Sequence, residues 1–185
     1  MRRKVMFKDF EISKFKKMTP PGENSFETMQ EVKELKKTPL NKSFVKKYDD
    51  IEAAFKDVAM KNNIEDYDEK LVESLIKDSA PVIIKLKKHF NRPRPKVSAK
   101  KLKITMKDYE MDSMKTPSYP SGHSTQGVLI GEVLSKKYPK ASKAFKKTAE
   151  NISYSRRVAR AHYKSDSKMG EKLGKEMFKH IKNKI

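Results

Sequence analysis

The sequence predicts an all-α protein, a single-domain bundle of six or more helices. Apolar residues recur at three- and four-residue steps along most of the chain, and the alternation typical of half-buried strands is missing. The 185 residues suit one globular domain, although 36% hydrophobic residues make a lean core. No repeat or interdomain linker is evident. We therefore expect residues 1–24 to be a partly ordered N-terminal extension and residues 25–185 to form one helical domain.

Three apolar stripes predict the helices of the first half. The stripes are Phe26, Met29, Val32 and Leu35; Phe44, Tyr48, Ile51, Phe55 and Val58; and Leu71, Leu75, Ile76, Ile83, Leu86 and Phe90. Asn24 or Ser25 is the expected N-cap of the first helix, and Asp68 that of the third. Pro81 interrupts the third stripe, which indicates either a kink or a fresh helix start.

Proline residues end the third helix and open a long connection. Arg92-Pro93-Arg94-Pro95 must stop the helix near Asn91, because proline lacks an amide donor and disfavours helical geometry in the residue before it. The polar stretch from Lys96 to Tyr119 is expected to be a surface loop with room for a short helix. Further helices are predicted from Gly122 to about Tyr138, from Ala141 to about His162, and over the last stripe, Met169, Leu173, Met177 and Ile181.

The composition favours anionic partners. The chain has 44 Lys+Arg against 24 Asp+Glu, a net charge of +20, which suits phosphate esters, nucleic acid or an acidic membrane surface. A lysine-rich surface with no dedicated site explains the charge equally well. No cysteine is present, which excludes disulfides and thiolate metal sites. Neither a signal peptide nor an apolar run of about 20 residues is found, so we expect a soluble, cytoplasmic protein.

Two short patterns carry the residue types that phosphoryl chemistry needs. Pro120-Ser121-Gly122-His123 precedes a predicted helix, and Ser155-Arg156, His162 and Asp166 form the pattern S-R-x5-H-x3-D. These patterns hold two of the four histidines. Cleaving a phosphate ester without a metal ion requires cations around the equatorial oxygens, an in-line nucleophile and an acid for the leaving oxygen. The sequence has candidates for each of these tasks.

The spacing suggests how the candidates act. Ser121 and Gly122 at a helix N-terminus would offer neutral donors and a favourable dipole to an anion. His162 and Asp166 are four residues apart and would share a face of a continuing helix. The carboxylate would then fix the imidazole tautomer and leave the other ring nitrogen free to attack phosphorus. His123 would protonate the leaving group.

An upstream K-x6-R-P element completes a recognisable set. The three elements, in this order, resemble the signature of the superfamily that joins type 2 phosphatidic acid phosphatases, bacterial non-specific acid phosphatases and vanadium haloperoxidases. They extend from Lys85 to Asp166. The first element reads either as Lys87 with Arg94-Pro95 or as Lys85 with Arg92-Pro93. We prefer the former, because in the family's stretch the second arginine-proline is the functional one.

The chain is most like the soluble bacterial class A acid phosphatases of that superfamily. The resemblance implies an acid phosphatase/vanadium haloperoxidase-like fold and a metal-independent phosphoric monoester hydrolase that forms a phosphohistidine. It implies that His162 is the nucleophile, His123 the general acid and Asp166 the orienting partner of His162. The phosphate-binding residues that it implies are Lys87, Arg94, Ser121, Gly122 and Arg156. No cofactor is required, and phosphate or vanadate is expected to bind in the active site.

Simpler roles remain open for the individual residues. Ser121 and Asp166 could be ordinary helix caps, and only the joint pattern favours a site over such roles. Arg156 lies six residues before His162, which is not one helical face, so spacing alone does not place its side chain. His89 and His180 lie outside the patterns and are expected at the surface or in packing.

Two other functions also remain open. One is a vanadium-dependent haloperoxidase that uses the same anion site, and the other is a basic protein that binds nucleic acid or an anionic membrane surface. For the phosphatase we expect small soluble esters such as nucleotides or sugar phosphates, with no specific nucleic-acid recognition. Peripheral contact with anionic surfaces and homo-oligomerisation are left open by the sequence.

Overall fold

The computed structural model describes residues 5–185, and all regular structure in that part is helical. The α-helices are α1 (Ser13–Lys16), α2 (Phe26–Lys37), α3 (Lys42–Asp49), α4 (Ile51–Lys61), α5 (Glu69–Phe90), α6 (Pro95–Lys101), α7 (Gly122–Lys137), α8 (Ser142–Val158) and α9 (Lys164–Ile181). Short 3-10 helices lie at Asp112–Lys115 and Pro139–Ala141. The predicted all-α class is confirmed.

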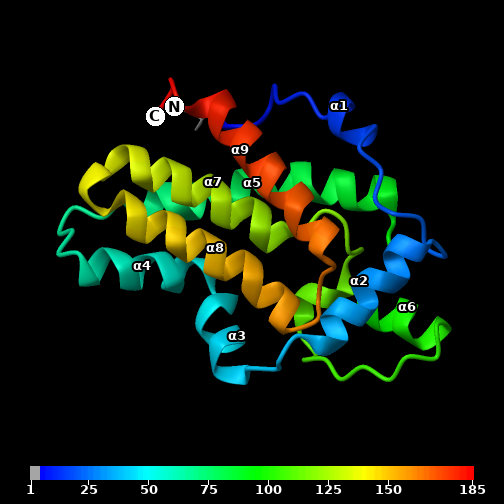
Figure 1. Cartoon of the computed structure of the whole chain (residues 1–185). Helices are drawn as coiled ribbons and strands as arrows, with labels where there is room; N and C mark the ends of the chain where they lie inside the picture. Colours follow the sequence, from blue (N-terminus) through cyan, green and yellow to red (C-terminus); the bar gives the residue numbers. More distant parts are fainter. Residues whose placement is uncertain (1–4) are drawn as a thin grey trace.

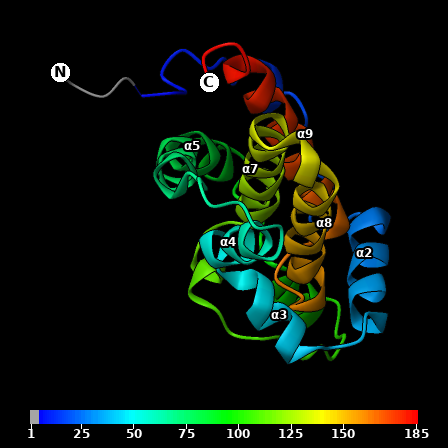
Figure 2. The same ribbon diagram turned by 90° about the vertical axis from the view of Figure 1, so that its left-hand side faces the viewer.

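Helix α7 lies at the centre of the bundle. It packs against α8 and α9 on one side and against α5 on the other, as Figure 2 shows. Glycines let α9 approach closely: a Cβ added to Gly170 would lie 2.5 Å from the Ser121 carbonyl oxygen, and one on Gly174 would lie 2.5 Å from that of Thr125. No side chain fits at such distances. The first turn of α7 is therefore in direct contact with the second and third turns of α9.

Side-chain caps fix where several helices begin. Ser25 and Asp68 each accept a hydrogen bond from the backbone amide three residues later, at 3.1 and 3.0 Å, which confirms both predicted caps. Ser121 caps α7 in the same way at 3.2 Å. Helix α5 ends where Asn91 adopts a left-handed φ of 47°, just before the Arg-Pro-Arg-Pro segment. The predicted end of this helix is confirmed.

Some predicted boundaries were wrong. The stripe from Phe44 to Val58 spans two helices, because Asp50 caps a new helix, α4, after α3 ends. Pro81 lies inside a continuous α5 and starts no new helix. The helix predicted to run from Ala141 to about His162 ends at Val158, so His162 lies in the connection to α9. The loop from Lys96 to Tyr119, by contrast, was predicted with room for a short helix, and it does include most of α6 and a 3-10 helix.

The segment before α2 contributes to the hydrophobic core. Phe7 and Phe15 are 4% and 0% exposed and belong to the same apolar cluster as residues of α5, α7 and α9. Residues 1–4 of the predicted extension lie outside the described residues. Within residues 5–185, no helix combines the length and apolar character needed to cross a lipid bilayer.

The two motif segments meet at one end of the bundle. In Figure 1 the start of α7, the end of α8 and the start of α9 all lie towards the right-hand side. The Ser121 amide donates to the Asp166 carbonyl oxygen at 3.1 Å. Residues separated by 45 positions in the sequence are thus joined by a backbone hydrogen bond.

Candidate active site

Asp166 is fully buried and accepts hydrogen bonds from four groups. Its Oδ2 accepts from the Ser118 hydroxyl and the Tyr163 amide (3.0 Å) and lies 3.2 Å from His162 Nδ1. Its Oδ1 accepts from Arg92 Nη1 at 2.7 Å. Burial alone would raise the pKa of this carboxyl group, but the hydrogen bond to His162 and the positive charges nearby hold it below its ordinary value. Asp166 is therefore an ionised acceptor at neutral pH.

The His162 ring lies between Asp166 and Arg94. Its Nδ1 faces the carboxylate, and its Nε2 lies 3.0 Å from Arg94 Nη1. A carboxylate only accepts and a guanidinium only donates, so the proton must be on Nδ1 and the lone pair on Nε2. Burial, together with the charges of Arg94 and Lys87 and against the opposing effect of Asp166, lowers the pKa of His162 to about 3. The ring is a neutral base, as a nucleophile requires.

Helix capping brings His162 and Asp166 together, and the predicted continuing helix was wrong. His162 precedes α9, whereas Asp166 is in its first turn and folds back to the amide of Tyr163, the N-cap residue. Arg160, at a left-handed φ of 57°, lies in the reversal between α8 and α9. Its guanidinium donates to three carbonyl groups, those of Lys36, Thr38 and Lys107. The reversal is thereby anchored to the neighbouring segments.

Three buried cations form a cluster beside His162: Lys87 and Arg94 act on the His162 ring, and Arg156 acts on Arg94 and His123. Lys87, Arg94 and Arg156 are 5%, 8% and 1% exposed. Burial lowers the pKa of Lys87 to about 7 and that of Arg94 to about 10. The charge of Arg94 also lowers the pKa of Lys87, and the charge of Arg156 also lowers the pKa of Arg94. The Asp166 carboxylate opposes both of these shifts. Placing these groups together is electrostatically costly, and an anion bound among them would relieve that cost.

Arg156 has a donor to spare. Its Nη1 donates to Asp49 Oδ1 at 2.8 Å and its Nε to Ser155 Oγ at 3.0 Å. Its Nη2 is buried and has no hydrogen-bond partner within the described part of the chain. A buried unsatisfied donor costs about 1–3 kcal/mol. An anionic oxygen is the natural partner for a guanidinium in this position.

The first turn of α7 lies against the same cluster. Ser121 is fully buried, and Gly122 begins the helix, so its amide is one of the donors that lack an intrahelical partner. A Cβ built on Gly122 would lie 3.6 Å from Ile83 Cγ2 and 3.9 Å from Lys87 Cε. The helix N-terminus therefore faces the lysine side chain, and both can contact one anion.

His123 stands between the buried cations and a surface recess. Its Nε2 lies 2.8 Å from the Asp49 carbonyl oxygen, to which it donates. Burial and the charge of Arg156, opposed by Asp49, lower the pKa of His123 to about 4. The recess also has polar lining, which includes Asp49, Glu110, Asp112, Ser113 and Lys115.

The structure distinguishes the two readings of the first motif element. Lys87 and Arg94 lie at the His162 side of the site, as described above. Lys85 is exposed, and Arg92 lies behind Asp166, stacked 3.8 Å above the Tyr163 ring and paired with Glu31 at 3.1 Å. Arg92 thus supports the carboxylate and has no contact with His162 among the hydrogen bonds found in residues 5–185.

The other two histidines lie away from the site, as predicted. His89 is exposed and bonds to the Lys16 carbonyl oxygen at 3.2 Å. His180 packs against the rings of Phe7 and Phe10. Within residues 5–185, no group of three or more His, Asp or Glu side chains is arranged to hold a metal ion.

Sequence reasoning missed Asp49 and Ser118. Asp49 is the last residue of α3 and lies 107 positions before Arg156, whose guanidinium it pairs with. Ser118 donates to Asp166 from the loop before the Pro120–His123 pattern. No fixed spacing connects either residue to the motifs, so only the tertiary structure could identify them.

Two comparisons relate the chain to known proteins. A family model described as the PAP2 superfamily matches residues 71–174, which include all three motif elements. A non-specific acid phosphatase of Salmonella typhimurium is 32% identical over 95 residues, or 51% of this chain. The match covers 38% of that protein's length.

Proposed function

The chain belongs to the PAP2 superfamily, and from that premise we propose that it hydrolyses phosphomonoesters without a metal ion, through a phosphohistidine intermediate at His162. The observation that carries this proposal is a cluster of three buried cations beside a neutral histidine, two of which act on its ring. These cations can supply the charge that a metal ion supplies in other phosphatases. The resemblance to an acid phosphatase supports the same reaction class.

Binding of the substrate is proposed to use the three buried cations and the first turn of α7. Lys87, Arg94 and the free Nη2 of Arg156 donate to the phosphate oxygens, together with the hydroxyl of Ser121 and the amide of Gly122. Arg94 Nη1 now contacts His162 Nε2 at 3.0 Å. As its donors turn to the phosphate oxygens, the Nε2 lone pair becomes free to face phosphorus.

The reaction then proceeds in two proposed displacements. His162 Nε2 forms a bond to phosphorus while the ester P–O bond breaks, and His123 gives its proton to the leaving oxygen. Asp166 stabilises the ring through Nδ1 as charge develops on it. In the second displacement, His123 takes a proton from water, the resulting hydroxide oxygen attacks phosphorus, and the P–N bond breaks to return His162 to its neutral form.

The recess beside His123 is the proposed place of the leaving group. It is lined mainly by polar and charged side chains, Asp49, Glu110, Asp112, Ser113, Lys115 and His123, with Met111. Such a lining suits hydroxyl-rich groups better than long apolar chains. Small soluble esters such as nucleotides or sugar phosphates therefore remain the proposed substrates.

Hydrolysis of an aryl phosphate tests the proposal. With a metal chelator present, we expect full activity and competitive inhibition by vanadate. His162 must be neutral and His123 protonated in the free enzyme, so kcat/KM should rise as the pH passes about 3 and fall as it passes about 4. The falling limb of kcat should lie at higher pH, because a bound phosphate dianion favours the protonated form of His123. Initial rates measured over the acidic range give both profiles.

Two outcomes would contradict the proposal. Loss of activity on chelation, with recovery on adding a divalent metal, would remove the metal-independent mechanism. Oxidation of bromide by peroxide after vanadate loading, without ester hydrolysis, would favour a haloperoxidase instead.

A further inference from the structure

A row of hydroxyl groups connects the phosphate site with a carboxylate on another face of the bundle. Ser124 Oγ donates to Ser121 Oγ at 2.9 Å and lies 2.8 Å from Ser153 Oγ. Ser153 Oγ in turn lies 2.7 Å from Glu171 Oε1. The three serines are at most 2% exposed. The row crosses from α7 through α8 to α9.

With Ser124 donating to Ser121, an ionised Glu171 leaves one contact of this row without a proton. Each hydroxyl group carries one proton, and an ionised carboxylate carries none. If Ser124 donates to Ser121 and Ser153 donates to Glu171, the 2.8 Å contact between Ser124 and Ser153 has no proton. The lone pairs of Ser124 Oγ and Ser153 Oγ would then face each other in a buried environment of low dielectric constant, which is unfavourable.

Two arrangements satisfy every contact. With a proton on Glu171, each group donates one step towards the phosphate site, and the proton of Ser121 is free for an anion. With Glu171 ionised, the row reverses, and Ser121 must donate to Ser124. A reversed Ser121 hydroxyl presents a lone pair, which repels phosphate oxygens. Whether Glu171 carries a proton therefore decides whether the Ser121 hydroxyl can donate to a bound anion.

We propose that Glu171 is a positioning residue for the phosphate site, which acts through Ser153 and Ser124 to set whether the Ser121 hydroxyl donates to a bound anion. This inference rests on the proposed function, since it concerns how the phosphate is held. Glu171 itself does not touch the substrate. It biases the orientation of a group that does.

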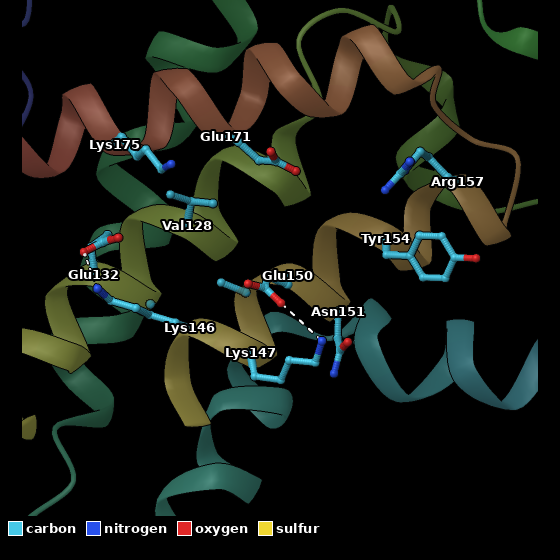
Figure 3. Close-up of a pocket in the computed structure, with 12 residues that line it drawn as sticks. Val128, Glu132, Lys146, Lys147, Glu150, Asn151, Tyr154, Arg157, Glu171 and Lys175 are labelled. Carbon is cyan, nitrogen blue, oxygen red and sulfur yellow. Dashed lines mark hydrogen bonds and ion pairs between the residues drawn. The ribbon is translucent and has the colours of Figure 1, made fainter. Parts of the chain in front are cut away.

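Glu171 is reachable from solvent at its end of the row. Figure 3 shows it projecting from α9 towards a pocket of about 520 Å³ between α7, α8 and α9. Charged groups from all three helices face the same pocket: Glu132 of α7, Lys146, Lys147, Glu150 and Arg157 of α8, and Lys175 of α9. Glu171 therefore borders solvent at a pocket that shares no lining residue with the recess beside His123.

Sulfate binding to Glu171→Gln tests the inference without catalysis. Sulfate is tetrahedral and stays dianionic from mildly acidic to neutral pH, so its own titration does not interfere. The glutamine amide can donate to Ser153 and lets the row run towards the site. We expect calorimetry at neutral pH to show sulfate bound about 10-fold more tightly than in the wild type, the size of one charge-assisted hydrogen bond.

Two further variants separate the row from general electrostatics. Glu150→Gln removes the same charge from the same pocket outside the row, and its sulfate affinity should stay near the wild-type value. Ser153→Ala cuts the row, so Glu171→Gln should have no further effect in that background.

The results distinguish the two proposals. Equal sulfate affinity in Glu171→Gln and wild type, or an equal gain in Glu150→Gln, would overturn the inference and leave the phosphatase proposal intact. A wild type that neither binds sulfate nor hydrolyses aryl phosphate would overturn both.

Discussion

Replacement of His162 by alanine is expected to lower kcat by about 10⁴-fold or more, as loss of a covalent nucleophile does in other enzymes. The variant loses the Nε2 lone pair but keeps Lys87, Arg94 and Arg156, which supply the anion site. Sulfate affinity should therefore stay near the wild-type value while turnover disappears. Steady-state rates on an aryl phosphate, with calorimetry of sulfate binding, measure both quantities.

The control for this variant is His89→Ala. His89 is exposed and bonds only to the Lys16 carbonyl oxygen among the hydrogen bonds found in residues 5–185, so its loss should leave kcat unchanged. A His162→Ala enzyme with most of its wild-type rate and a normal fold would contradict the nucleophile assignment. In that case the histidine would be a buried structural group beside Asp166.

Replacement of Asp166 by alanine is expected to damage both stability and activity. Ser118, His162 and the Tyr163 amide lose their buried acceptor, and Arg92 loses one of its two carboxylate partners but keeps Glu31. Removing one partner of a buried ion pair costs about 3–5 kcal/mol. Loss of the tautomer-fixing carboxylate should also lower kcat by about 10⁴-fold. Urea denaturation and steady-state kinetics measure the two effects.

The pH dependence of stability gives an internal check. The pKa of Asp166 is lowered in the folded protein, so its stabilising effect is full above the ordinary aspartate pKa and is lost as the pH falls through the lowered value. The stability difference between wild type and Asp166→Ala should therefore be largest at neutral pH and shrink in strong acid. The interpretation fails if the variant has wild-type stability at neutral pH.

Local rules predicted most of the fold. Helix periodicity located the helices, and capping chemistry identified Ser25 and Asp68 because these signals depend only on neighbouring residues. The same local logic placed Ser121 and Gly122 at the start of a helix. This logic did not predict the break between α3 and α4. There Asp50 caps a new helix and divides one continuous apolar stripe.

Contacts between residues far apart in the sequence could not be predicted from the sequence alone. Arg92 and Arg94 have the same local pattern, and only the packing of Arg92 against Tyr163 and Glu31 separates their roles. The link between Arg156 and Asp49 joins α8 to the end of α3. The hydroxyl row to Glu171 crosses three helices, so no periodicity in one helix could reveal it.

The most direct test of the proposed mechanism is to trap the phosphoryl group on the protein. A labelled aryl phosphate is mixed with the enzyme, quenched in alkali, where phosphohistidine survives, and the labelled peptide is identified by mass spectrometry. We predict a label on His162 that forms within the first turnover and is missing from His162→Ala. Rapid turnover without any label on His162, or a label on another residue, would contradict the mechanism.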